Sequence, residues 1–190
     1  MTSVAKHFAT EADIAELPEN VVGEIIDGDL IASPRPAGPH TRAATAATAE
    51  IYGPYDRGRG GPGGWWILFE PELHFTSNIL VPDIAGWRRE RMPEIPSDHR
   101  FTVVPDWVCE VISPSSATTD RIRKLRIYAR AGVQYAWIID PLAKSLEVYR
   151  NTSEAWLLVQ GFSADEGDTL VRAEPFTDIE LDLAAMWQRS

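Results

Sequence analysis

The sequence has 190 residues, 44% of them hydrophobic and seven of them tryptophan, and it carries a net charge of −10. This apolar content excludes a disordered chain, and the single cysteine excludes both an intrachain disulfide framework and a cysteine-based zinc cluster. Neither a signal-peptide core nor an apolar run of about 18 residues is present, so we expect a soluble cytoplasmic protein without a membrane partner. We expect a single domain over residues 1–190, in which residues 1–20 form an N-terminal helical extension.

The N-terminal part of the chain predicts a short helix followed by a β-hairpin. Residues 10–17 have capping residues at the start of the pattern and a proline directly after it, which is typical of a helix. Residues 21–31 predict the hairpin, which turns at Asp27 and Gly28. Glu24 falls in an apolar strand of this hairpin, where it either lines a site or pairs with an arginine of a neighbouring strand.

An alanine-rich helix and a glycine-rich loop come next. Residues 40–52 have good helix propensity, and His40 stands at the start of this helix. A histidine there is either a capping or surface residue, or a residue that contacts the substrate. Residues 58–64 precede a strand and lack the Gly-Lys-Ser/Thr ending of a nucleotide-binding loop, so they predict a flexible loop.

The remaining pattern predicts a mixed sheet flanked by helices. Strand patterns cover residues 65–75, 80–87, 107–112, 135–140, 146–149 and 156–160, and helices cover residues 117–131 and 181–188. The helix at 117–131 allows a parallel crossover between the strands before and after it, whereas the later strands follow one another as hairpins. Glu70 and Glu72 are two residues apart on a predicted strand and share one face, where one of them either pairs with an arginine or joins a metal shell.

Glu110 stands inside the apolar strand at residues 107–112. A carboxylate in such a strand costs several kcal/mol or more unless it is paired, protonated or bound to a metal. Glu110 is therefore a candidate functional residue. The alternatives are a solvated position at the strand end or a buried pair with an arginine.

Asp83 also interrupts an apolar segment, directly after Pro82. The proline removes one backbone donor, which favours an edge strand or a bulge, and bulges often redirect a side chain near an active site. Pro-Asp is also a common turn dipeptide. The second strand with an isolated acid, which carries Glu110, favours the functional interpretation.

Lys124 lies on the predicted helix at 117–131, which ends at Gly132. Asp120, Lys124 and Tyr128 recur every four residues and share one face, which is either a functional face or a solvated one. Phosphodiester hydrolysis needs carboxylates that hold a hard divalent cation and a positive charge that steadies the attacking water. The two acids and this lysine therefore predict a metal-dependent phosphodiesterase.

These residues resemble a known pattern. Asp83 after Pro82, then Glu110 before Val111, then a helix with Lys124 resemble the PD-(D/E)XK superfamily of restriction-endonuclease-like nucleases, and within it the Uma-type restriction endonuclease family. The resemblance extends over residues 20 to 187, with further similar blocks at residues 23–30, 40, 109–116, 128–133 and 137–141. It implies an α/β fold with a restriction-endonuclease-like mixed central sheet flanked by helices and with extra β-hairpins.

One position departs from the superfamily pattern. The lysine of the pattern stands two residues after the strand glutamate, and Ile112 occupies that place here. The resemblance implies that Lys124, on the following helix, replaces it.

The resemblance also implies an activity and a set of site residues. It implies a metal-dependent endonuclease that hydrolyses phosphodiester bonds of nucleic acid, with DNA as the expected substrate and Mg²⁺ or Mn²⁺ as the cofactor. Asp83 and Glu110 would hold the metal, and Lys124 would orient the attacking water or stabilise the developing charge. Accessory candidates are Glu24, His40, Glu70, Glu72, Asp120 and Tyr128, and candidate phosphate contacts are Arg121, Arg123 and Arg126.

The net charge argues against a nucleic-acid partner, because basic residues normally neutralise the phosphates. The acids, however, concentrate outside the motif: residues 31–130 carry thirteen basic and eleven acidic residues. Two alternatives remain. A nuclease-like domain that binds nucleic acid without cutting it is consistent with Ile112, and a glycosidase would use Asp83 and Glu110 as paired carboxylates. An enzyme that cuts both strands of a duplex is expected to act as a homodimer.

Overall fold

The computed structural model describes residues 8–35, 38–153 and 155–187. Within these residues a six-stranded sheet has the order β11-β10-β9-β8-β6-β3, and a five-stranded sheet has the order β2-β1-β5-β4-β7. The first sheet consists of β3 (Trp65–Phe69), β6 (Ile84–Arg88), β8 (Trp107–Val111), β9 (Tyr135–Asp140), β10 (Ser145–Asn151) and β11 (Trp156–Ser163). The second consists of β1 (Val21–Ile26), β2 (Asp29–Pro34), β4 (Glu72–Phe75), β5 (Asn78–Leu80) and β7 (Arg100–Phe101).

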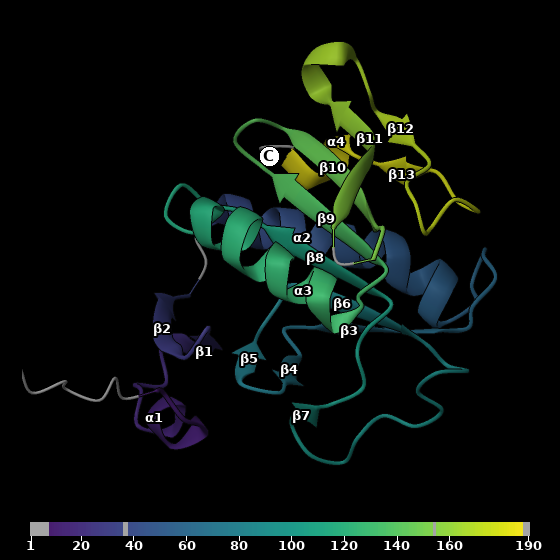
Figure 1. Cartoon of the computed structure of the whole chain (residues 1–190). Helices are drawn as coiled ribbons and strands as arrows, with labels where there is room; N and C mark the ends of the chain where they lie inside the picture. Colours follow the sequence, from purple (N-terminus) through teal and green to yellow (C-terminus); the bar gives the residue numbers. More distant parts are fainter. Residues whose placement is uncertain (1–7, 36–37, 154, 188–190) are drawn as a thin grey trace, which may run out of the picture.

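Helices cover both faces of the six-stranded sheet. Figure 1 shows α3 in front of this sheet and α2 behind it. The helical elements are α1 (Glu11–Ala15), α2 (Gly38–Ile51), the π-helical turns η1 (Tyr52–Asp56) and η2 (Thr119–Lys124), α3 (Leu125–Ala131), the 3-10 turn η3 (Ala164–Glu166) and α4 (Ala184–Trp187). A small pair of strands, β12 (Leu170–Val171) and β13 (Leu181–Asp182), lies near α4.

The sheet separates two hydrophobic clusters. On the α2 side, Ala43 and Ala47 pack in a cluster with Trp107 and Trp137. On the α3 side, Tyr128 packs in a cluster with residues of β8, β9 and the five-stranded sheet. Small residues on α2 let that helix approach the bulky tryptophans of the strands closely, and each face of the sheet is thereby buried.

The predicted crossover is confirmed. Strands β8 and β9 are parallel neighbours, joined by η2 and α3. The strand that carries Glu110 lies inside the six-stranded sheet rather than at its edge. The connecting helix ends at Gly132, whose φ of 92° is a left-handed conformation that glycine adopts without strain. Residues 112–118 connect the carboxyl end of β8 to η2, and the contact of Glu110 with Lys124 places Glu110 next to that turn.

The two strands predicted over residues 65–75 and 80–87 are each wrong in extent. Each range contains two strands, because the hairpin bends from one sheet into the other. Strand β3 pairs with β6 in the six-stranded sheet, and β4 pairs with β5 in the five-stranded sheet. Glu70, with a φ of 46°, precedes Pro71 on one side of the bend, and Pro82 lies on the other side. Glu70 N donates to Asp83 O at 3.0 Å across the bend.

The ends of the chain differ in smaller ways. The predicted hairpin turn is confirmed, with positive φ angles at Asp27 (54°) and Gly28 (82°). The predicted closing helix begins late, because residues 181–182 form β13 and the helix starts at Ala184. Residue 188 of that prediction, and residues 1–7 of the predicted extension, lie outside the described residues. No helix in the described part is long and apolar enough to cross a membrane.

Candidate active site

Glu110 and Lys124 form a buried ion pair at the end of β8. Lys124 Nζ lies 2.8 Å from Glu110 Oε1, and Tyr128 OH donates to the same oxygen at 2.6 Å. All three residues are buried, with exposed fractions of 2% or less. Two donors on one oxygen favour the ionised carboxylate, because charged acceptors make the stronger hydrogen bonds.

Glu24 brings the five-stranded sheet to the same ammonium. Its Oε1 lies 2.9 Å from Lys124 Nζ and accepts a hydrogen bond from Val81 N at 2.8 Å. Lys124 Nζ also donates to Val81 O at 3.1 Å. The three protons of this ammonium thus have three acceptors, from Glu110, Glu24 and Val81. One lysine thereby connects the helix to both sheets.

The π-helical turn η2 directs Asp120 and Lys124 toward the acids. Asp120 Oδ1 lies 3.8 Å from Lys124 Nζ, and Asp120 N donates to Ser116 O at 2.9 Å. A π-helical turn changes the direction of successive side chains within a helix and is frequent at functional sites. Asp120, Lys124 and Tyr128 consequently face one cluster, and they come from consecutive turns of one helical segment.

Asp83 lies at the bend, directly before β6. Its Oδ2 accepts a hydrogen bond from Val111 N at 2.7 Å, and its Oδ1 lies 3.2 Å from His40 Nε2 at the start of α2. The register of β6 and β8 pairs Ile84 with Cys109. Asp83 directly precedes β6, and Val111, whose N–H group binds it, directly follows Glu110, so the two acids lie at the same end of these neighbouring strands.

Burial shifts the pKa values of the groups around the ammonium. Burial raises the pKa of Glu110 well above its usual value, and the neighbouring Lys124 opposes that rise. Burial acts to lower the pKa of Lys124, but the carboxylates of Glu110 and Glu24 outweigh burial and raise that pKa well above its usual value. Burial also raises the pKa of Asp120. With three acceptors around Nζ, the lysine is an ammonium at neutral pH.

His40 and Glu70 form the more exposed side of the site. Burial acts to lower the pKa of His40, but its contact with the Asp83 carboxylate raises that pKa above the usual value. Burial and the negative charge of Asp83 raise the pKa of Glu70. The side chain of Glu70 is 23% exposed and that of His40 is 14% exposed, against 3% for Glu110. The side of Asp83, His40 and Glu70 is therefore the more accessible side of the cluster.

The structure separates Glu70 from Glu72, which were expected to share one face of a strand. The bend ends β3 at Phe69 and starts β4 at Glu72, so the two glutamates are not on the same strand. Glu72 instead lies 2.6 Å from His74 Nε2. The predicted geometry is wrong because a proline and a left-handed residue interrupt the strand between them.

The three arginines predicted to contact phosphates are paired with acids of the same chain. Arg121 pairs with Glu147 of β10. Arg123 pairs with Asp29 at 2.9 Å and Arg126 pairs with Asp27 at 2.7 Å, both at the β1–β2 turn. Arg123 also donates to Ile26 O at 2.6 Å. The contacts of Arg123 and Arg126 hold the β1–β2 turn against η2 and α3, and the contact of Arg121 joins η2 to β10. A phosphate would have to displace an acid from each of these arginines.

The residues at the bend fit a hard divalent cation. Within the described residues, no group of three or more His, Cys, Asp or Glu side chains is arranged to hold a metal alone. Mg²⁺ needs fewer protein ligands, because it is commonly bound by one or two carboxylates together with water and substrate phosphates. Asp83 and Glu110 supply two carboxylates at one end of the neighbouring strands β6 and β8, and carboxylate oxygen is the donor that Mg²⁺ requires.

A surface hollow of about 410 Å³ lies elsewhere, at the C-terminal end of α3. Its lining includes Arg130, Tyr135 and Arg150, and none of the candidate acids lies in it. The candidate acids and the Glu110–Lys124 ion pair accordingly form a packed cluster at the strand ends, near the N-terminal end of α3.

Two elements of the cluster were missed from the sequence. The N–H and C=O groups of Val81 bind Glu24 and Lys124, and the N–H group of Val111 binds Asp83. Every residue has these backbone groups, so the sequence carries no signal for them.

Residues 12–184 match the model of the Uma2 family, whose description is "putative restriction endonuclease". The chain belongs to the Uma2 family. The resemblance seen in the sequence is thereby confirmed. This Uma2 chain is also similar to the crystal structure of a "putative nuclease belonging to DUF820" from Anabaena variabilis. The two are 25% identical with a TM-score of 0.73, over 93% of this chain and 96% of that chain.

The structural similarity confirms the predicted α/β fold, which is restriction-endonuclease-like with mixed sheets. No curated protein matches the chain.

Proposed function

We propose that this Uma2 protein is a metal-dependent endonuclease that hydrolyses phosphodiester bonds of nucleic acid, with DNA as the substrate. Membership of a family described as restriction endonucleases, and the similarity to a nuclease structure, support nuclease activity. The observation that carries the proposal is the arrangement of three groups from separate elements: Glu110 and Lys124 are 2.8 Å apart, and the Asp83 carboxylate accepts a hydrogen bond from the N–H group of Val111, the residue after Glu110.

The proposed metal ligands are Asp83 and Glu110, with Mg²⁺ or Mn²⁺ as the cation. When bound, such a cation polarises a phosphate oxygen and lowers the pKa of a water molecule. The protein contributes the arrangement of the two carboxylates. Val111 N and His40 fix the Asp83 carboxylate, and Tyr128 fixes the Glu110 carboxylate. Groups fixed in this way need no reorganisation when the substrate arrives.

Lys124 is the proposed source of positive charge beside the scissile phosphate. Its ammonium, held by three acceptors, cannot turn away from the acids. We propose that it orients the attacking water or stabilises the negative charge that develops on the phosphate. Its position on η2 compensates for Ile112, which stands where the superfamily pattern has a lysine. The Lys124 ammonium would therefore reach the two acids from η2, whereas the lysine of the superfamily pattern stands on the strand.

Cleavage of supercoiled plasmid DNA tests the proposal. The purified protein should nick the plasmid in Mg²⁺ or Mn²⁺ and should be inactive in EDTA. Nicking that survives EDTA would contradict the metal dependence, whereas hydrolysis of a glycoside substrate in EDTA, without plasmid nicking, would favour the glycosidase alternative. Binding of DNA without any cleavage in either metal would favour the binding-module alternative. That alternative has one structural feature in its favour, since Lys124 and Tyr128 already satisfy Glu110.

A further inference from the structure

The exposed side of α2 and the loop after it carry three arginines that form no ion pair with the described residues. Arg42, Arg57 and Arg59 are all exposed. Among the residues that the structure describes, none of the three has a carboxylate within ion-pair distance. The arginines of η2 and α3 that were predicted to bind phosphates differ, because each has such a partner. In a chain of net charge −10, these three arginines are free to receive an external anion.

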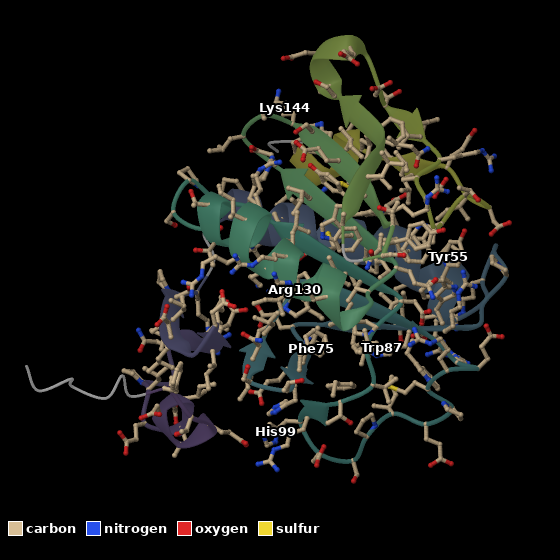
Figure 2. All side chains as sticks on the ribbon, in the orientation of Figure 1. Tyr55, Phe75, Trp87, His99, Arg130 and Lys144 are labelled. Carbon is tan, nitrogen blue, oxygen red and sulfur yellow. The ribbon has the colours of Figure 1, made fainter. Side chains whose placement is uncertain are left out.

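The glycine-rich loop that presents Arg57 and Arg59 has a fixed shape. Arg57 N donates to Tyr52 O at 3.1 Å, Arg59 N to Gly53 O at 2.9 Å, and Gly63 N to Pro54 O at 2.9 Å. These bonds tie the loop to η1, whose Tyr55 is labelled in Figure 2. The sequence predicts a flexible loop, whereas backbone hydrogen bonds hold this loop to η1. Its two arginines are presented in a defined place at the C-terminal end of α2.

The C-terminal end of the loop is also held by a backbone hydrogen bond. Arg89 N donates to Gly64 O at 2.9 Å, and the Arg89 guanidinium stacks over the Trp66 ring at 3.8 Å. Its NH2 group donates to Asp56 O at 2.7 Å. Arg88 lies over the Trp65 ring at 4.7 Å. The loop is therefore flanked by two further guanidinium groups, and both are anchored on aromatic rings.

No exposed residue of α2, which runs from the acids to the loop, is acidic. The exposed side chains of α2 include Arg42, Thr45 and Ala49, and all of the exposed positions apart from Arg42 are small. The single acid of α2, Glu50, is half-buried and accepts a hydrogen bond from Asp182 N at 3.1 Å. At the other end of α2, His40 contacts Asp83. A backbone that lies along α2 therefore meets no exposed carboxylate of the helix itself.

We propose that Arg42, Thr45, Arg57 and Arg59 form an α2 face that binds the sugar-phosphate backbone of the nucleic-acid substrate and leads it to the acids. This proposal rests on the proposed function. Guanidinium and hydroxyl groups are common phosphate contacts. Fourteen residues of α2 span about 20 Å at 1.5 Å per residue, which is about six base-pair steps of a duplex. The face and the acids are thus within reach of one substrate molecule.

Binding of a fluorescent 20-base-pair duplex, measured in EDTA, tests the α2 face. The double variant Arg57→Ala with Arg59→Ala should bind at least about tenfold more weakly near 0.1 M salt, and its salt slope should fall by about 1.8, or 0.9 per lost contact. The matched control is Arg130→Ala with Lys144→Ala, which removes the same charge from two exposed residues away from α2, both labelled in Figure 2. The control should change binding by less than about twofold. Equal losses in the two double variants would overturn the proposal.

Plasmid cleavage in Mg²⁺, measured with the same proteins, separates this proposal from the nuclease assignment. If the wild type binds but never cleaves, and the loop variant alone loses binding, the α2 face stands and the nuclease function fails. If the wild type cleaves, and the loop variant binds and cleaves as well as its control, the α2 face is overturned and the nuclease function stands.

Discussion

Lys124 Nζ and Glu110 Oε1 lie 2.8 Å apart, although the lysine belongs to a π-helical turn and the glutamate to an interior strand of the six-stranded sheet. Both residues are 2% exposed. A charge pair so deeply buried contributes to the free energy of folding as well as to any chemistry, because each partner compensates for the lost hydration of the other. Variants at this pair must be examined for stability and for activity.

The stability role of Lys124 is tested by Lys124→Met, which removes the charge and keeps most of the side-chain volume. We expect the free energy of unfolding to fall by about 3–5 kcal/mol in metal-free buffer, because Glu24 and Glu110 remain buried without a counter-charge. Urea unfolding measures the change, and the exposed Lys144→Met serves as the control, with a change within about 0.5 kcal/mol. A loss no larger than that of the control would contradict a buried charge pair. Mg²⁺ should restore part of the stability.

The metal-binding role of the acids predicts that Asp83→Asn and Glu110→Gln lose plasmid cleavage while they retain DNA binding. In EDTA their affinity for DNA should equal or exceed that of the wild type, because each change removes negative charge from the site at which the scissile phosphate is proposed to bind. Glu72→Gln, which lies outside the cluster, should leave cleavage unchanged. Loss of DNA binding in a folded acid variant would mean that the acids bind another ligand, and the nuclease assignment would then fail.

Tyr128 is expected to position Glu110 through the 2.6 Å hydrogen bond. Tyr128→Phe should lower the free energy of unfolding by about 1 kcal/mol and should lower kcat about 10-fold with little change in KM, as expected for a group that orients a metal ligand. Tyr149→Phe removes a similar bond, to Glu147 at 2.6 Å, outside the site. It should reproduce the stability change and leave kcat unchanged. A similar kcat loss in both variants would contradict the positioning role.

The contact of His40 with Asp83 predicts a pH-dependent stability. The pKa of His40 is raised in the folded state by Asp83, so protonation of His40 stabilises the fold. This contribution is fully present below the unfolded pKa of about 6.5 and is lost as the pH rises through the raised folded value. The unfolding free energy of the wild type minus that of His40→Gln should therefore decline with rising pH. Thermal or urea unfolding in metal-free buffer from about pH 5.5 to 8.5 measures it, and a difference that grows with pH would contradict the assignment.

Much of the site could be predicted from the sequence because its signals are local. An isolated acid in an apolar strand identifies Glu110, and a four-residue spacing on a helix identifies Asp120, Lys124 and Tyr128 as one face. The parallel crossover follows from a helix between two apolar strands. The π-helical character of η2 was not predictable, since no residue type specifies it.

The remainder depends on contacts between distant segments. The prolines at 71 and 82 are visible in the sequence, but the passage of one hairpin into two sheets depends on which strands it meets. Arg123 and Arg126 are on an exposed basic helix, and only the folded chain brings the β1–β2 turn to them. The same holds for Glu24, whose contact with Lys124 joins residues one hundred positions apart.

The most direct test of the proposed metal site is a crystal of the wild type soaked in Mn²⁺, with the anomalous signal of the metal located. We predict a Mn²⁺ ion bound by carboxylate oxygens of both Asp83 and Glu110, at distances of about 2.1 Å, and its absence from the same site in Glu110→Gln. A saturating soak that leaves no anomalous peak beside these two carboxylates, in a protein that nicks plasmid in Mn²⁺, would contradict the site.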